Sequence, residues 1–285
     1  MVRMALVLAY DGTNYHGFQF QPPERGRTIQ GEVERVWQNL FHETIRLIPA
    51  GRTDAGVHAA GQVVSFTTAA AIPAVNVPKA LNSLLPRDIR VLRAERAADG
   101  FNARRDARWK RYDYFIDNAR IPDVFTRLYR LHEPVPLATE DMRRAALSFQ
   151  GRRDFHAFAA AGGAARCFVR TLYHCRVLVS GGLIQIICVG DGFLYNMVRI
   201  IAGTLISVGK GKMTPAAAAA ALEAGRRAGA GMTALARGLT LTHVEYGLRI
   251  PSALFADLEP NNWEKASLSK ETYRIRQEFG LVTGL

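Results

Sequence analysis

The first hundred residues alternate between short apolar runs and turn-rich segments, which is typical of strands and helices joined by tight connections. Apolar side chains recur every three or four positions over 28–41 and predict a helix with Thr28 as its N-cap. A second, shorter helix is expected over 77–85, ended by Pro86. Four apolar runs predict strands over residues 3–10, 44–48, 62–68 and 89–97.

The order of these elements is that of a ferredoxin-like or RNA-recognition-type α+β unit. The rest of the chain repeats the alternation without visible sequence repetition. Strands are predicted over 109–117, 168–179, 183–189 and 239–246. Helices are predicted over 139–150 with Thr139 as N-cap, from about 197 to 208, and over 214–228, with a polar-aromatic loop over 151–158. We therefore expect two α+β lobes, residues 1–103 and 104–248, and a polar tail over 249–285 that has no assigned role and a helical stretch near 263–279.

The predicted helix that ends near Val208 is apolar on almost every side, as is typical of a buried helix. Its exceptions, Asn196, Arg199 and Gly203, lie at i, i+3 and i+7 and therefore form one stripe. A buried arginine needs a partner. Two partners stay open for Arg199: a carboxylate in a structural ion pair, or a bound polyanion.

Composition and charge narrow the class of protein. A hydrophobic content of 48% indicates a globular chain, and no apolar run approaches the length of a membrane span. The net charge of +12, carried mostly by arginine, points towards a nucleic acid. The three cysteines show no CxxC spacing and the N-terminus has no secretory signal, so we expect reduced thiols and a cytoplasmic protein.

The densest basic run, residues 104–111, leads into the strand predicted over 109–117. The side chains expected on one face of this strand are Arg108, Lys110, Tyr112 and Tyr114. Cations interleaved with aromatic rings suit contact with phosphate and stacking on bases. The alternative is an edge strand that its charges keep soluble.

The loop Gly51–Ala59 presents Arg52 and Asp54 between two predicted strands. Gly51 and Gly56 permit positive φ and close approach to a ligand. We expect Asp54 to stay ionised, because a neighbouring guanidinium lowers the pKa of a carboxyl group. An ionised carboxylate on a rigid loop is a candidate nucleophile, and the alternative is an aspartate that only caps a turn.

A nucleotide-binding loop is not expected. The segment 209–212 departs from a Walker A motif in its spacing from Gly203 and in having Gly211 where Ser or Thr belongs. Nucleotide hydrolysis is therefore excluded, and we expect no nucleotide, metal or other cofactor.

Several segments together resemble the TruA family of tRNA pseudouridine synthases. The segments that carry the resemblance are Tyr10–Thr13, Gly17–Gln19, Gly51–Ala59, Gly61–Val63, Arg111–Tyr114, Gly192–Arg199, Gly203–Leu205 and Gly238–Leu239. They occur in the family's order over residues 3–248. Several motifs in order are more specific than one loop, and they favour the nucleophile for Asp54 over the turn cap.

The resemblance implies that Asp54 is the catalytic aspartate, that Arg52 is its neighbour on the loop and that Tyr112 stacks on the target uracil. It also implies two lobes whose mixed, mainly antiparallel sheets join across a central cleft. The family works as a homodimer on the anticodon stem-loop of tRNA, where it isomerises uridines 38, 39 and 40. Arg199 is a candidate partner for the Asp54 carboxylate.

The chemistry agrees with the residues. Isomerisation breaks the bond between uracil N1 and the ribose and rejoins the base through C5, which needs no redox cofactor. Two other classes of protein remain as alternatives. A non-catalytic RNA-binding module explains the charge but not an acid in a basic groove, and an assembly protein predicts no salt-sensitive RNA binding.

Overall fold

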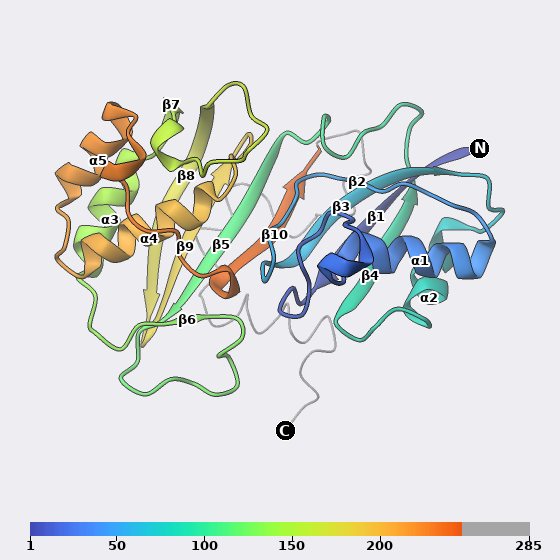
Figure 1. Cartoon of the computed structure of the whole chain (residues 1–285), viewed down its shortest axis with the longest axis horizontal. Helices are drawn as coiled ribbons and strands as arrows, with labels where there is room; N and C mark the ends of the chain where they lie inside the picture. Colours follow the sequence, from blue (N-terminus) through green and yellow to red (C-terminus); the bar gives the residue numbers. More distant parts are fainter. Residues whose placement is uncertain (247–285) are drawn as a thin grey trace.

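The computed structural model describes residues 1–246, which form one mixed sheet with helices packed near both of its ends (Figure 1). The strands are β1 (Val2–Tyr10), β2 (Ile48–Pro49), β3 (His58–Thr68), β4 (Ile89–Arg96), β5 (Trp109–Asp117), β6 (Leu131–His132), β7 (Gly151–Asp154), β8 (Val169–Ser180), β9 (Leu183–Gly190) and β10 (Leu239–Glu245). The helices are α1 (Ile29–Phe41), α2 (Val77–Asn82), α3 (Thr139–Ser148), α4 (Met197–Gly209) and α5 (Pro215–Ala224).

The sheet runs without a break through both halves of the chain, in the order β4-β1-β3-β10-β5-β9-β8-β7. Strand β10 joins the halves, because it pairs in parallel with β3, where Thr240 lies opposite His58, and antiparallel with β5. Most of the other pairs are antiparallel. The predicted α+β fold with a joined, mainly antiparallel sheet is therefore confirmed. Since β5 is an interior strand, the edge-strand interpretation of residues 109–117 is wrong.

The helices divide between the two ends of the sheet (Figure 1): α1 and α2 lie beside β1 and β4, and α3, α4 and α5 lie together near β8 and β9. On α1, the ring of Trp37 packs edge-on against Phe66 of β3, with ring centroids 4.8 Å apart. The Thr28 hydroxyl accepts a hydrogen bond from the Gly31 N–H at 3.2 Å, which confirms the predicted N-cap.

Four local predictions are wrong. The strand expected over 44–48 is reduced to Ile48, the first residue of β2. Thr139 does not cap α3: it is the first helical residue, and Ala138 before it donates its N–H to the Gly209 carbonyl at the end of α4. Residues 151–154 form the exposed strand β7, whose polar side chains hide the strand pattern. Helix α5 ends at Ala224 because Gly225 adopts a left-handed φ of 66°.

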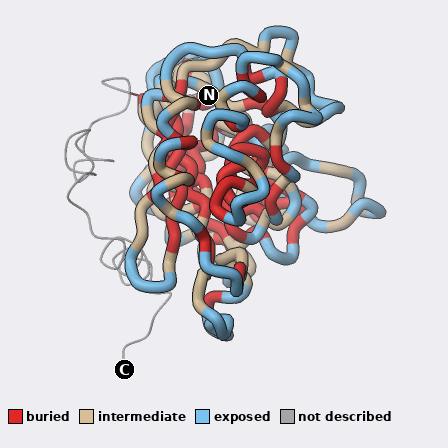
Figure 2. Tube along the Cα trace, turned by 90° about the vertical axis from the view of Figure 1, so that its left-hand side faces the viewer, coloured by how far each residue is buried: buried red, intermediate tan, exposed pale blue. Residues whose placement is uncertain are grey.

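Helix α4 is buried along almost its whole length, as its apolar sequence predicts. Figure 2 shows buried residues concentrated in the interior of the molecule, with exposed segments at its outline. The predicted stripe is only partly correct: Arg199 and Gly203 face the segment 232–234, whereas Asn196 precedes the helix with a left-handed φ of 60°. The Ala234 N–H donates to the Arg199 carbonyl at 3.0 Å, and the missing side chain of Gly203 leaves room for the Met232 backbone.

Replacing Gly203 by alanine is expected to destabilise the fold by about 3 kcal/mol or more, near the upper end of overpacking effects. A Cβ at this position would lie 1.8 Å from the Met232 carbonyl oxygen, a backbone atom that has no alternative rotamer. Gly209→Ala is the matched control on the same helix, since its Cβ meets the flexible Met142 side chain first, at 2.7 Å. Urea unfolding should show a larger loss of stability for Gly203→Ala, and equal losses would contradict the steric argument.

The predicted division into lobes at residues 103 and 104 stays a prediction. The tail over 249–285, with its expected helix near 263–279, lies outside the described residues. No helix within residues 1–246 is long and apolar enough to cross a membrane.

Candidate active site

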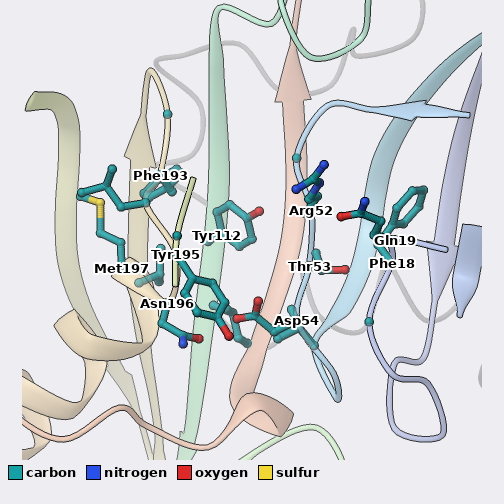
Figure 3. A pocket seen from close by; sticks show the side chains of 18 of the residues that line it. Phe18, Gln19, Arg52, Thr53, Asp54, Tyr112, Phe193, Tyr195, Asn196 and Met197 are labelled. Atoms are coloured by element: carbon teal, nitrogen blue, oxygen red, sulfur yellow. The ribbon is translucent and has the colours of Figure 1, made fainter. Parts of the chain in front are cut away.

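A cavity of about 770 Å³ lies between segments from the two halves of the chain. Its walls come from residues 16–21, the loop before β3, strand β5 and the segment between β9 and α4. In Figure 3, Arg52, Thr53 and Asp54 lie across from Tyr112 and Tyr195. The predicted residues Arg52, Asp54 and Tyr112 all line this cavity, which corresponds to the central cleft expected between the lobes.

Buried polar groups hold the loop that carries Asp54. The Tyr10 hydroxyl lies 2.8 Å from the Thr53 hydroxyl, and burial raises the pKa of Tyr10 to about 12, so the phenol stays protonated. The Gln62 side chain donates to the Gly51 carbonyl at 2.7 Å. The Phe18 N–H donates to the Thr53 carbonyl at 3.0 Å. These contacts fix Gly51 and Thr53, the part of the loop that precedes Asp54, and so limit the movement of the carboxylate.

Gly17 lets the neighbouring segment approach this loop closely. Its φ is 92°, in the left-handed region, and a Cβ there would lie 2.9 Å from the Thr53 carbonyl oxygen. On the loop itself only Gly56, at φ 77°, has the positive φ expected of both loop glycines. Gly51 instead leaves space beside the side chains of Lys110 and Tyr112.

Asp54 is partly buried, with 27% of its side chain exposed, and its carboxylate lies 3.4 Å from the Arg199 guanidinium. Burial raises the pKa of Asp54, and the charge and hydrogen bond of Arg199 oppose that shift without cancelling it. The expectation that Arg52 lowers the pKa of Asp54 is therefore wrong. Arg52 is exposed, and Figure 3 shows its side chain pointing away from the Asp54 carboxylate.

Arg199 does not line the cavity itself but lies behind Asp54, where three groups hold its guanidinium. Its Nε donates to the Ala234 carbonyl and one Nη to the Asn196 side chain, both at 2.8 Å. The same Nη contacts Asp54. Of the two partners left open for this buried arginine, the structure provides the carboxylate, and the carboxylate is Asp54.

Tyr112 is 6% exposed and packs edge-on against Phe193, with ring centroids 5.0 Å apart. Burial raises the pKa of its phenol, and the nearby Tyr10 and Asp54 add to that shift. The predicted RNA-facing side of β5 is only partly correct: Lys110 and Tyr112 line the cavity, whereas Tyr114 is fully buried and donates to the Leu235 carbonyl. Arg108, just before the strand, does not line the cavity either.

The sequence analysis did not single out two residues at or near the site, Tyr195 and His58. Tyr195 lines the cavity with 46% of its surface exposed, and it belongs to the segment 192–199 that carried part of the family resemblance. His58 is buried at the start of β3: its Nδ1 accepts from the Gly12 N–H at 3.1 Å, and its Nε2 lies 3.1 Å from the Leu128 carbonyl. It thus connects the start of β3, just after the loop that carries Asp54, to both halves of the chain. No local sequence pattern predicts that role, because the hydrogen-bond partners of His58 are far apart in the sequence.

Within the part of the chain that the structure describes, no group of three or more His, Cys, Asp or Glu side chains is arranged to hold a metal ion. All three cysteines are free thiols. Cys175 and Cys188 are buried as expected, and Cys167 is exposed.

Comparison with known proteins identifies the family. A family model described as tRNA pseudouridine synthase matches residues 6–104 and 145–247. The tRNA pseudouridine synthase A of Moorella thermoacetica is 49% identical over 243 residues, which cover 85% of this chain and 99% of that protein. The protein of the same name from Bacillus subtilis is 45% identical over 247 residues, 86% of this chain and 99% of its own length.

A chain of the solved Cbf5-Nop10-Gar1 complex aligns with 84% of this chain and 48% of its own length, at 13% identity and a TM-score of 0.35. The two relatives named above match this chain over nearly their whole length. The matched ranges contain Asp54 and its partner Arg199. The chain therefore belongs to the tRNA pseudouridine synthase A (TruA) family, isomerases that convert uridine in tRNA.

Proposed function

We propose that the chain converts uridine to pseudouridine at positions 38, 39 and 40 in the anticodon stem-loop of tRNA, with Asp54 as the nucleophile. One observation carries the role of Asp54: it is the only carboxylate among the described residues that line the cavity, which also contains Arg52, Arg104, Lys110 and Arg170. An acid in a basic cavity repels phosphate. A module that only binds RNA gains nothing from a carboxylate in this cavity, whereas an enzyme with a covalent step needs a nucleophile there.

The reaction conserves atoms and electrons. The Asp54 carboxylate adds either to C1′ of the ribose or to C6 of the uracil, and both options stay open. The N1–C1′ bond breaks, the uracil turns within the cavity, and C5 bonds to C1′. If Asp54 is bonded to C1′, C5 displaces its carboxylate from C1′ as the new bond forms. If Asp54 is bonded to C6, its carboxylate leaves C6 after the C5–C1′ bond has formed. Loss of the C5 proton and protonation of N1 then give pseudouridine.

The residues around Asp54 support this reaction by position. The target uridine first leaves its helical stack, which costs a few kcal/mol. We propose that Tyr112 stacks on the extracted uracil and that Arg52, exposed at the rim, fills the vacated stack or binds phosphate. Arg199 favours the ionised form of the nucleophile and orients it, since its guanidinium contacts the carboxylate and is itself held by Asn196 and Ala234.

The test is to incubate the protein with unmodified tRNA, without metal or cofactor, and to map pseudouridine by carbodiimide-dependent primer-extension stops. We expect stops at positions 38, 39 and 40. Stops confined to another arm of the tRNA would overturn the proposed range of uridines. The homodimer implied by the resemblance stays a prediction, and light scattering on the purified protein checks it. The cytoplasmic location expected from the free thiols also stays a prediction.

Replacing Tyr112 by alanine is expected to lower kcat/KM by about 10- to 100-fold, because one stacked base contributes about 1–3 kcal/mol. Steady-state kinetics on tRNA transcripts measures the loss. Tyr112→Phe keeps the ring and should bind tRNA as the wild type does, so a slower rate in this variant would assign removal of the C5 proton to the hydroxyl. An alanine variant with unchanged kcat/KM would contradict stacking.

A further inference from the structure

A buried lysine lies in the wall of the cavity, and the proposed chemistry does not use it. Lys110, on β5 two residues before Tyr112, is 8% exposed and lines the cavity. The end of its aliphatic stem passes the loop that carries Asp54, since Cδ and Cε lie 3.7 Å from where a Cβ on Gly51 would be. The hydroxyl of Tyr112 lies 3.5 Å from the same point.

The ammonium group of Lys110 has no hydrogen bond or ion pair with any residue in the range 1–246. A buried cation without a partner is costly, so a protein normally pairs it. Here the lysine side chain lines the cavity, where a ligand can reach it. An anionic ligand in the cavity could therefore pair with this ammonium group.

The charged neighbours of Lys110 strengthen this interpretation. Arg104 approaches from the segment before β5 and Arg170 from β8, and both line the same cavity. Arg170 is positioned by its own contacts, because its Nη1 donates to the Cys167 carbonyl at 3.0 Å and its Nε lies 3.4 Å from where a Cβ on Gly192 would be. Three cations from three separate segments therefore surround one region of the wall.

One acid lies near this group. Asp191, at the end of β9, acts on Lys110 electrostatically, but its Oδ1 accepts the Thr171 N–H at 3.0 Å. Burial and the two arginines outweigh Asp191 and lower the pKa of Lys110 to about 8. The local field is thus positive and uncompensated, and an anion entering the cavity would relieve it.

We propose that Lys110, with Arg104 and Arg170 beside it, binds a phosphodiester group of the RNA strand that enters the cavity. This inference rests on the proposed function, because it assumes an RNA substrate in this cavity, but it adds a specific anion site. Its position on the strand that carries Tyr112 places the bound phosphate close to the extracted nucleotide. Lys110 would then help to hold the backbone while the base turns.

The experiment measures the affinity of the whole folded protein for tRNA that the wild-type enzyme has already converted, so that no turnover occurs. The variants are Lys110→Met, Lys110→Arg and, as a matched control, Lys79→Met, which removes an exposed lysine on α2 outside the cavity. Dissociation constants are determined at several salt concentrations at pH 7 and again at pH 9. Circular dichroism and thermal unfolding check that each variant folds.

We expect Lys110→Met to bind tRNA about tenfold more weakly at pH 7, in line with loss of a hydrogen bond to a charged group. The slope of log K against log salt should become shallower by about 0.7 to 0.9, the contribution of one phosphate contact. Wild-type affinity should fall between pH 7 and pH 9 as Lys110 loses its proton. Lys110→Arg keeps its positive charge at both pH values, so its affinity for tRNA should fall less between pH 7 and pH 9. Titration of the RNA affects both proteins equally and therefore cancels in this comparison.

A Lys110→Met variant that folds and binds with the affinity and salt slope of the wild type would overturn the phosphate site. Should Lys110→Met fail to fold, Arg170→Met removes another cation of the same group, and an unchanged affinity and salt slope in that variant would overturn the site. The map of pseudouridines is a separate readout. Stops in another arm would contradict the proposed function alone, whereas unchanged binding with stops at 38–40 would contradict only this inference.

Discussion

Replacing Asp54 by asparagine is expected to lower the rate of pseudouridine formation by about 10⁴-fold or more, the scale seen when a covalent nucleophile is removed. The amide matches the carboxylate in shape but is neutral and does not add to C1′ or C6. The side chain keeps its place against Arg199, so the loss is chemical and not structural. Tritium release from tRNA labelled at C5 of uridine measures the rate.

Binding separates the role of Asp54 from a general loss of structure. Asp54→Asn should bind tRNA at least as tightly as the wild type, because it removes a negative charge from a cavity that also contains four cations. Asp99→Asn, at an exposed loop position outside the cavity, is the control and should keep full activity. An Asp54→Asn enzyme that retains even a tenth of the wild-type rate would rule out the nucleophile.

The sequence predicted Asp54 and Tyr112 as cavity residues because local motifs carry them. It also named Arg199 as a candidate partner for Asp54, which the contact of 3.4 Å between the two side chains confirms. What it assigned wrongly is the effect of Arg52 on the pKa of Asp54. Arg52 is two positions away in the sequence, but its side chain points away from the carboxylate. The guanidinium that contacts the carboxylate lies 145 positions further along the chain, so its position depends on the fold.

The fold shows the same difference: features set by neighbouring residues could be predicted, whereas features set by contacts between distant residues could not. Thr28 accepts the capping hydrogen bond that was predicted for it, and Thr214, predicted as the first residue of its helix, accepts one as well. Thr139 is the same residue type in a similar pattern, but Ala138 donates its N–H to the Gly209 carbonyl at the end of α4, and the helix begins one residue earlier than predicted, at Thr139 itself. The joining of the halves by β10 depends on pairing between Thr240 and His58, which are 182 positions apart, and no local pattern encodes it.

Removal of the Arg199 guanidinium is the prediction that tests this distant contact. Arg199→Met is expected to lower the rate of isomerisation by about 10²- to 10³-fold at neutral pH, the scale for loss of one preorganised electrostatic contact. Burial alone raises the pKa of Asp54, and Arg199 opposes the shift. Without Arg199 the pKa rises further, so a smaller fraction of Asp54 is ionised at a given pH. The acid limb of the pH–rate profile should therefore move to higher pH.

Single-turnover rates measured from acid to alkaline pH check both the loss and its direction. Part of the activity should return in Arg199→Met as the pH rises, because the remaining carboxyl groups ionise, whereas Asp54→Asn should stay inactive throughout. Arg237→Met removes an exposed arginine outside the cavity and should leave the profile unchanged. If the acid limb of Arg199→Met coincided with that of the wild type, Arg199 would act by position alone, since a cation that sets the charge of its partner has to appear in the titration.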